Sequence, residues 1–102
     1  MSEPSTVERE FTVTSELGLH ARPAGQFVRL AGRFSAEIAV SANREWVSGR
    51  SVLSLLSLAA SKGTRLKIRA SGSDAEEAID ALGRLLEHPA EFPFGTGSAD
   101  SG

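Results

Sequence analysis

The sequence of 102 residues contains no cysteine and only two histidines, His20 and His88, which lie far apart in the chain. The lack of cysteine excludes disulfides and thiolate chemistry, and two isolated histidines do not form a metal site, so we expect neither a metal nor another cofactor. A chain without cysteine gains nothing from an oxidising compartment. We therefore expect a cytoplasmic protein that is held together by its hydrophobic core alone.

An excess of charge of one sign is also missing, because 11 basic residues are mixed with 13 acidic ones and the net charge is −2. Nucleic-acid binding needs a basic field, so we expect no nucleic-acid partner. The longest largely apolar run, Val52–Ala60, would span only about 14 Å as a helix, whereas a bilayer core is about 30 Å thick. The N-terminus lacks the basic and apolar regions of a secretory signal. We expect no membrane insertion.

The spacing of apolar residues predicts four strands and three helices. Alternation of apolar and polar residues marks the strands, and apolar residues three and four apart mark the helices. A capping box of Ser73 and Glu76 is expected to start the last helix, and Gly63 to end the second. In chain order the expected elements are a strand over 7–14, a helix over 21–33, strands over 37–40 and 45–47, a helix over 52–62, a strand over 66–70 and a helix over 75–87.

The order β-α-β-β-α-β-α contains split β-α-β units, whose crossover helices pack on the same side of one sheet. We therefore predict an α+β fold, a two-layer open-faced sandwich in which a four-stranded antiparallel sheet is covered on one face by three helices. The chain length fits one domain. We expect this domain over residues 7–88, a flexible N-terminal extension over 1–6 and a disordered C-terminal tail over 89–102, where few apolar residues are available to offset the entropy of ordering.

The segment Gly18–Ala24 carries the residues best suited to chemistry. It places His20 at the start of a predicted helix, where unpaired backbone N–H groups attract anions and disfavour a cationic imidazole. Pro23 fits the first helical turn because its missing N–H costs nothing there. Arg22 lies in the same turn, and its guanidinium can bind a phosphate through two hydrogen bonds. A lone histidine at this position is more often a simple helix cap, so His20 by itself does not decide between a cap and a nucleophile.

The whole Gly18–Ala24 segment closely resembles the active-site segment of the HPr family, the histidine-containing phosphocarriers of the bacterial phosphoenolpyruvate-dependent phosphotransferase system. The resemblance extends over about residues 11–86. It implies that His20 accepts a phosphoryl group and that Arg22 stabilises it. A protein of this kind carries a phosphohistidine intermediate and is a relay rather than a turnover enzyme.

A second similar stretch, Val47–Leu53, leads into the second predicted helix. A serine at the position of Ser51 is the regulatory phosphorylation site in many HPr-family members, and Ser51 is also a good helix N-cap by its chemistry, so both interpretations stand. That helix is too apolar to have a single buried stripe. We expect Val52, Leu53 and Leu56 to form an exposed patch beside His20 that binds partner proteins.

The resemblance implies an upstream partner of the enzyme I type, a downstream acceptor of the enzyme IIA type and a possible HPr serine kinase. The chain departs in details from the sugar-uptake members of the family, and its second helix, together with residues 36–38, also resembles the nitrogen-related branch, so both branches stay open. A regulatory module, whose docking depends on phosphorylation of His20 or Ser51, is an alternative function. A small hydrolase using Arg22 as an anion clamp is a weaker one, because no general base accompanies His20.

Overall fold

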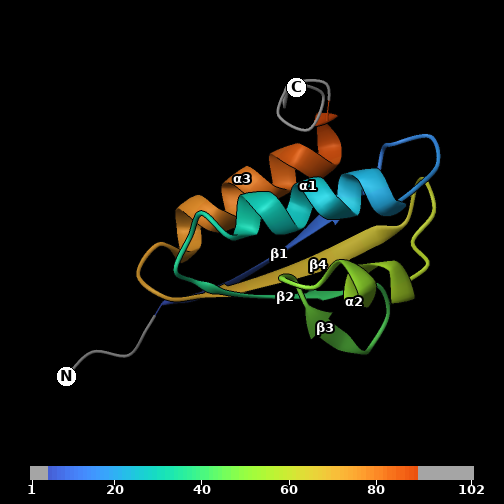
Figure 1. The fold of residues 1–102 in the computed structure, drawn as a ribbon. Helices are drawn as coiled ribbons and strands as arrows, with labels where there is room; N and C mark the ends of the chain where they lie inside the picture. The colour runs from blue at the N-terminus through green and yellow to red at the C-terminus, as the bar shows by residue number, and fades with distance from the viewer. Residues whose placement is uncertain (1–4, 90–102) are drawn as a thin grey trace, which may run out of the picture.

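The computed structural model describes residues 5–89, which form four strands and three helices (Figure 1). The strands pair antiparallel in the order β1-β4-β2-β3, and the long helices α1 and α3 lie side by side over one face of the sheet. The predicted open-faced α+β sandwich is thus confirmed. The elements are β1 (Thr6–Thr12), α1 (Ala21–Ala31), β2 (Glu37–Ser41), β3 (Trp46–Ser48), α2 (Val52–Ser57), β4 (Arg65–Ser71) and α3 (Ala75–Glu87).

The core lies between the sheet and the helices. In the central strand β4, Leu66, Ile68 and Ala70 are fully buried, whereas the basic residues between them are exposed on the open face. Each buried leucine or isoleucine contributes about 1.5–3 kcal/mol, so this alternation fixes which face of the sheet the helices cover. The largest fully buried side chains come from all three helices and from the two central strands: Phe27, Val40, Leu55, Leu66, Ile68, Ile79 and Leu82.

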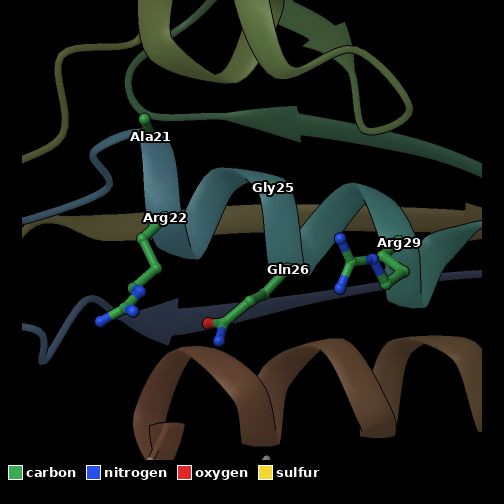
Figure 2. Close-up of a pocket in the computed structure, with 5 residues that line it drawn as sticks. All are labelled: Ala21, Arg22, Gly25, Gln26 and Arg29. Atoms are coloured by element: carbon green, nitrogen blue, oxygen red, sulfur yellow. The ribbon is translucent and has the colours of Figure 1, made fainter. Parts of the chain in front are cut away.

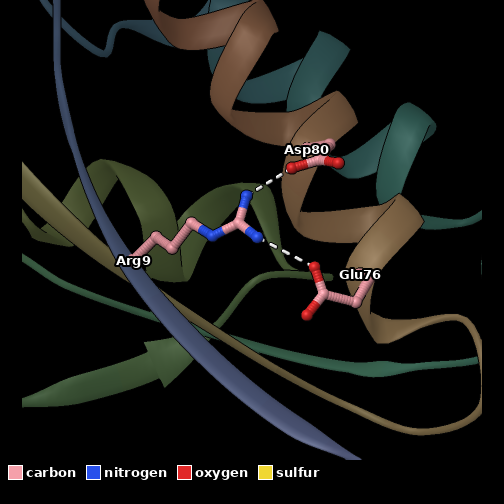
Figure 3. Close-up of polar contacts among 3 residues, drawn as sticks. All are labelled: Arg9, Glu76 and Asp80. Atoms are coloured by element: carbon pink, nitrogen blue, oxygen red, sulfur yellow. Dashed lines mark hydrogen bonds and ion pairs between the residues drawn. The ribbon is translucent and has the colours of Figure 1, made fainter.

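The edge strand β1 is tied to α3 by polar contacts. Arg9 lies on the helix-facing side of β1 and forms ion pairs with Glu76, at 2.8 Å, and with Asp80 (Figure 3). The backbone N–H of Thr12 donates to Glu87 at 3.0 Å. Exposed ion pairs contribute little to stability, about 0.2–1 kcal/mol each, so their main effect is to set how α3 lies along the edge of the sheet.

The loop between α1 and β2 is held by two charged side chains. One Nη of Arg50 donates to the carbonyl oxygens of Phe34, at 2.8 Å, and Ala36, at 2.7 Å. The carboxylate of Asp74 accepts from the backbone N–H groups of Ser35 and Ala36, each at 2.9 Å. The bond from the Ser35 amide, more than any other contact, lowers the pKa of Asp74 below its ordinary value. Charged side chains therefore bind both carbonyl oxygens and N–H groups of this loop's backbone.

Three predicted helix ends were wrong, and the first strand ends at Thr12 rather than at residue 14. The capping box of Ser73 and Glu76 does not form, because the N-cap of α3 is Asp74 and its carboxylate binds the loop described above. Helix α2 ends at Ser57 rather than near Gly63, since the chain turns at Ala59, which has φ +53°. The first helix ends at Ala31 instead of continuing to residue 33.

The predicted N-terminal extension over 1–6 and tail over 89–102 lie mostly outside the described residues, and β1 already begins at Thr6. Within residues 5–89, no helix is long and apolar enough to span a membrane. The same part of the chain holds no group of three or more potential metal-binding side chains.

Candidate functional site

His20 lies at the N-cap of α1, in an extended conformation with φ −89° and ψ −170°. Its carbonyl oxygen accepts the first helical hydrogen bond, from the backbone N–H of Ala24 at 3.0 Å. Its imidazole makes no capping hydrogen bond, although capping is the usual role of a polar side chain at this position. The ring is half-buried and is left available to another group.

The loop before His20 holds it in place. Gly18 has φ +75°, and its N–H donates to the carbonyl of Ser15 at 2.9 Å while the Ser15 hydroxyl donates to the Gly18 carbonyl at 2.5 Å. Leu19 is buried, and its N–H donates to the carbonyl of Ala60 at 2.8 Å. His20 therefore follows directly on a residue that is anchored in the core and hydrogen-bonded to the loop after α2.

An ion pair joins the same two loops at the surface. Lys62, after α2, donates to Glu16, before α1, at 2.8 Å. This hydrogen bond and the positive charge of Lys62 lower the pKa of Glu16. Both side chains are largely exposed, so the pair adds to the backbone contacts between the loops rather than replacing them.

The start of α1 offers few free donors. Pro23 has no N–H, and the N–H of Ala24 donates to the carbonyl of His20. At this helix end, the backbone N–H groups of Ala21 and Arg22 therefore remain without a partner within residues 5–89. Both belong to the two residues directly after His20. The anion-binding capacity of this helix end is therefore concentrated beside the imidazole.

The side chain of Arg22 lies along the side of α1. It forms no hydrogen bond or ion pair within residues 5–89, and it projects on the same side of the helix as Gln26 and Arg29 (Figure 2). Together with Ala21 and Gly25, these residues line a surface groove of about 440 Å³. Arg22 thus lies in the first turn of the helix that His20 caps, and its side chain lines the groove without a partner within residues 5–89.

Ser51 is the N-cap of α2, and its hydroxyl oxygen accepts from the N–H of Ser54 at 3.1 Å. The capping role expected from the sequence is confirmed. Of the three predicted patch residues, Leu53 is 79% exposed, whereas Val52 and Leu56 are partly buried and pack against the core. Only Leu53 therefore presents most of its apolar surface to solvent.

One residue was missed by the sequence reasoning. Leu17, three positions before His20, is 77% exposed and is, with Leu53, one of two large apolar side chains described as exposed among residues 5–89. The signal was present, because an isolated leucine between Glu16 and Gly18 lies in the turn that precedes the helix and follows no apolar periodicity. Leu17 thus lies exposed in the turn that leads to His20.

A comparison with known protein families identifies the family of the chain. The family described as "PTS HPr component phosphorylation site" matches residues 7–88. The chain belongs to the HPr family. The resemblance seen in the sequence around His20 is thereby confirmed, and HPr proteins are phosphocarriers of the phosphotransferase system.

Individual HPr relatives agree in sequence and in structure. The phosphocarrier protein HPr of Pseudomonas aeruginosa is 41% identical over 80 residues, which cover 78% of this chain and 89% of the relative. The crystal structure of a phosphocarrier protein HPr from Bacillus anthracis matches with a TM-score of 0.77 at 38% identity and covers 80% of this chain and 98% of that one.

The same HPr unit occurs within a larger protein. A multiphosphoryl transfer protein of Haemophilus influenzae is 36% identical over 86 residues, which cover 81% of this chain but only 17% of that protein. This HPr-like unit is thus found both alone and as part of a longer chain.

Proposed function

We propose that His20 accepts a phosphoryl group from a phosphoenolpyruvate-dependent protein of the enzyme I type and passes it to an acceptor of the enzyme IIA type. The observation that carries the proposal is the N-cap geometry of His20, whose imidazole makes no capping hydrogen bond. Membership of the HPr family supports it further. We place this relay in the cytoplasm, as the composition of the chain suggests.

The transfer step needs a ring nitrogen with a free lone pair. As this nitrogen forms its bond to phosphorus, the bond between phosphorus and the donor's atom breaks and the donor keeps that electron pair. The new negative charge is then met by the N–H groups of Ala21 and Arg22, each helix-end interaction contributing about 0.3–1 kcal/mol. This stabilisation is modest, which suits a carrier that has to release the group again.

Arg22 supplies the second part of the anion site. Its guanidinium has no partner to give up within residues 5–89, so rotation toward a phosphorylated His20 costs only a change of rotamer. A charge-assisted hydrogen bond to a phosphoryl oxygen is about twice as strong as a neutral one. We therefore assign Arg22 to phosphate stabilisation and not to binding of the imidazole itself.

A regulatory module is the second candidate, in which phosphorylation of Ser51 by an HPr serine kinase controls docking. The observation that favours it is that Ser51 lies close in sequence to the exposed Leu53. Ser51 is a helix N-cap, a position at which a phosphate is tolerated. Onward transfer separates the two functions. The protein labelled with ³²P is purified and mixed with IIA-type acceptors of the sugar-uptake and nitrogen-related branches. A relay loses its label to one of them, whereas a pure regulator keeps it with both.

A further inference from the structure

The arginines of this protein differ in whether their charge is paired. Within residues 5–89 most guanidinium groups have a polar or charged partner, including Arg9, Arg50 and Arg69. The guanidinium groups without one in this part of the chain are those of Arg22, Arg29 and Arg44. Two of them line the same groove along α1, while Arg44 lies in the turn between β2 and β3. Two of the three unpaired arginines of residues 5–89 thus lie at one shallow surface groove.

The groove is shallow and has room for a small ligand. Its volume of about 440 Å³ lies within the range of about 300–1,000 Å³ that is common for small-molecule sites. Gly25 lies between the two arginines in the sequence, and a β-carbon added there would meet no atom within 4 Å. The side chains of Arg22, Gln26 and Arg29 project on the same side of the helix (Figure 2).

The spacing of the arginines indicates the chemistry of the ligand. Arg29 lies seven positions after Arg22, which places their Cα atoms about 10.5 Å apart along the helix axis. Each guanidinium fork matches one phosphoryl group, so a ligand with two such groups engages both arginines and a ligand with one does not. We infer that this groove binds a small molecule that carries at least two phosphoryl groups.

The inferred site overlaps the proposed phosphorylation site in one residue. A ligand in the groove engages Arg22, the residue assigned above to a phosphorylated His20. Bound polyphosphate therefore lowers the rate of phosphoryl acceptance, and this consequence rests on the proposed function. Binding itself requires only the two arginines and does not depend on His20.

The test is an NMR titration of the ¹⁵N-labelled full chain with inorganic tripolyphosphate, and with orthophosphate at the same ionic strength. Amide shifts confined to residues 21–29, and binding of tripolyphosphate about tenfold tighter than of orthophosphate, are expected because two guanidinium groups act together. Shifts spread over all basic surfaces, or equal affinity for both anions, would overturn the inference. The inference would also be overturned if a glutamate-rich peptide shifted the same amides and tripolyphosphate did not.

Two arginine variants form a matched pair for the same titration. Arg29→Ala is expected to weaken tripolyphosphate binding about tenfold, whereas Arg44→Ala, which removes an unpaired arginine elsewhere, leaves it unchanged. Equal loss in both variants would mean that only net charge matters, and would contradict a specific site. His20→Ala is expected to bind tripolyphosphate normally, so a failure of the phosphocarrier proposal and a failure of the groove proposal give different results.

Discussion

The backbone at Gly18 lies directly against the backbone at Ala60. A β-carbon at Gly18 would overlap the carbonyl oxygen of Ala60 and lie 2.8 Å from the Cα of Ser61, and the same carbonyl accepts the N–H of Leu19 at 2.8 Å. The position of His20 is therefore set by the loop that follows α2 as well as by its own helix. This contact explains why a glycine is needed two residues before the histidine.

Gly18→Ala is expected to lower the free energy of unfolding by about 2 kcal/mol or more, because alanine is strained at φ +75° and collides with backbone that cannot move aside easily. Urea denaturation measures the change. Gly25→Ala is the control. Gly25 lies in α1 with open space where a β-carbon would stand, so the variant's free energy of unfolding should rise by about 0.5–1 kcal/mol. A Gly18→Ala variant as stable as Gly25→Ala would contradict this account of the loop.

The loop after α2 also contains strain of its own. Ala59 has φ +53°, which an alanine adopts at a cost and a glycine adopts freely. Ala59→Gly is expected to raise the free energy of unfolding by about 0.5–1 kcal/mol, after allowance for the greater freedom of glycine in the unfolded chain. Ala81→Gly, within α3, should instead lose about 1 kcal/mol. A loss of stability in both variants would rule out strain at Ala59.

Asp74 links stability to pH. Its pKa is lowered in the folded protein, chiefly by the N–H of Ser35, so its contribution is present above the ordinary value of about 3.9 and is lost as the pH falls below it. Asp74→Ala should therefore be less stable than the wild type at pH 7, and the difference should shrink as the pH falls below the ordinary carboxyl pKa of about 3.9. Thermal melts at a series of pH values measure it. The exposed Glu45→Ala serves as the control, and a constant difference for Asp74→Ala would contradict the role of its charge.

Ser51 separates stability from docking. Ser51→Ala removes the cap of α2 and should cost about 1 kcal/mol, while Ser51→Asp keeps an acceptor at the N-cap and should melt within a few degrees of the wild type. The added charge lies next to the exposed Leu53, where a partner has to bury apolar surface. The rate at which His20 is phosphorylated should therefore fall about fivefold in Ser51→Asp. Ser51→Thr controls for the change of side chain. An unchanged rate in Ser51→Asp would leave Ser51 as a helix cap only.

Much of the fold could be predicted from the sequence because it follows from local periodicity. The alternation of Leu66, Ile68 and Ala70 with basic residues sufficed to place β4 and its buried face. The cap at Ser51 was likewise predictable, since serine is among the residues preferred at a helix N-cap. Each of these features depends on neighbours within a few positions of the chain.

The features that could not be predicted depend on contacts between distant residues. The Ser73–Glu76 box failed because Asp74 finds better donors in the loop at Ser35, almost forty positions away. The early end of α2 at Ser57 comes with the turn at Ala59, after which the carbonyl of Ala60 accepts from the N–H of Leu19, far away in the sequence. The direction of the Arg22 side chain could not be predicted for a different reason, because the rotamer of a surface side chain is not set by its neighbours in sequence.

The central claim is that His20, and not the second histidine, carries the phosphoryl group. The most direct test incubates the wild type, His20→Ala and His88→Ala with phosphoenolpyruvate and an enzyme I and measures intact mass before and after mild acid. His88 is a matched control, because it is exposed at the C-cap of α3, far along the chain from the proposed site. We expect one acid-labile phosphoryl group on the wild type and on His88→Ala and none on a folded His20→Ala. Acid-labile phosphate on His20→Ala, or its loss from His88→Ala alone, would contradict the account.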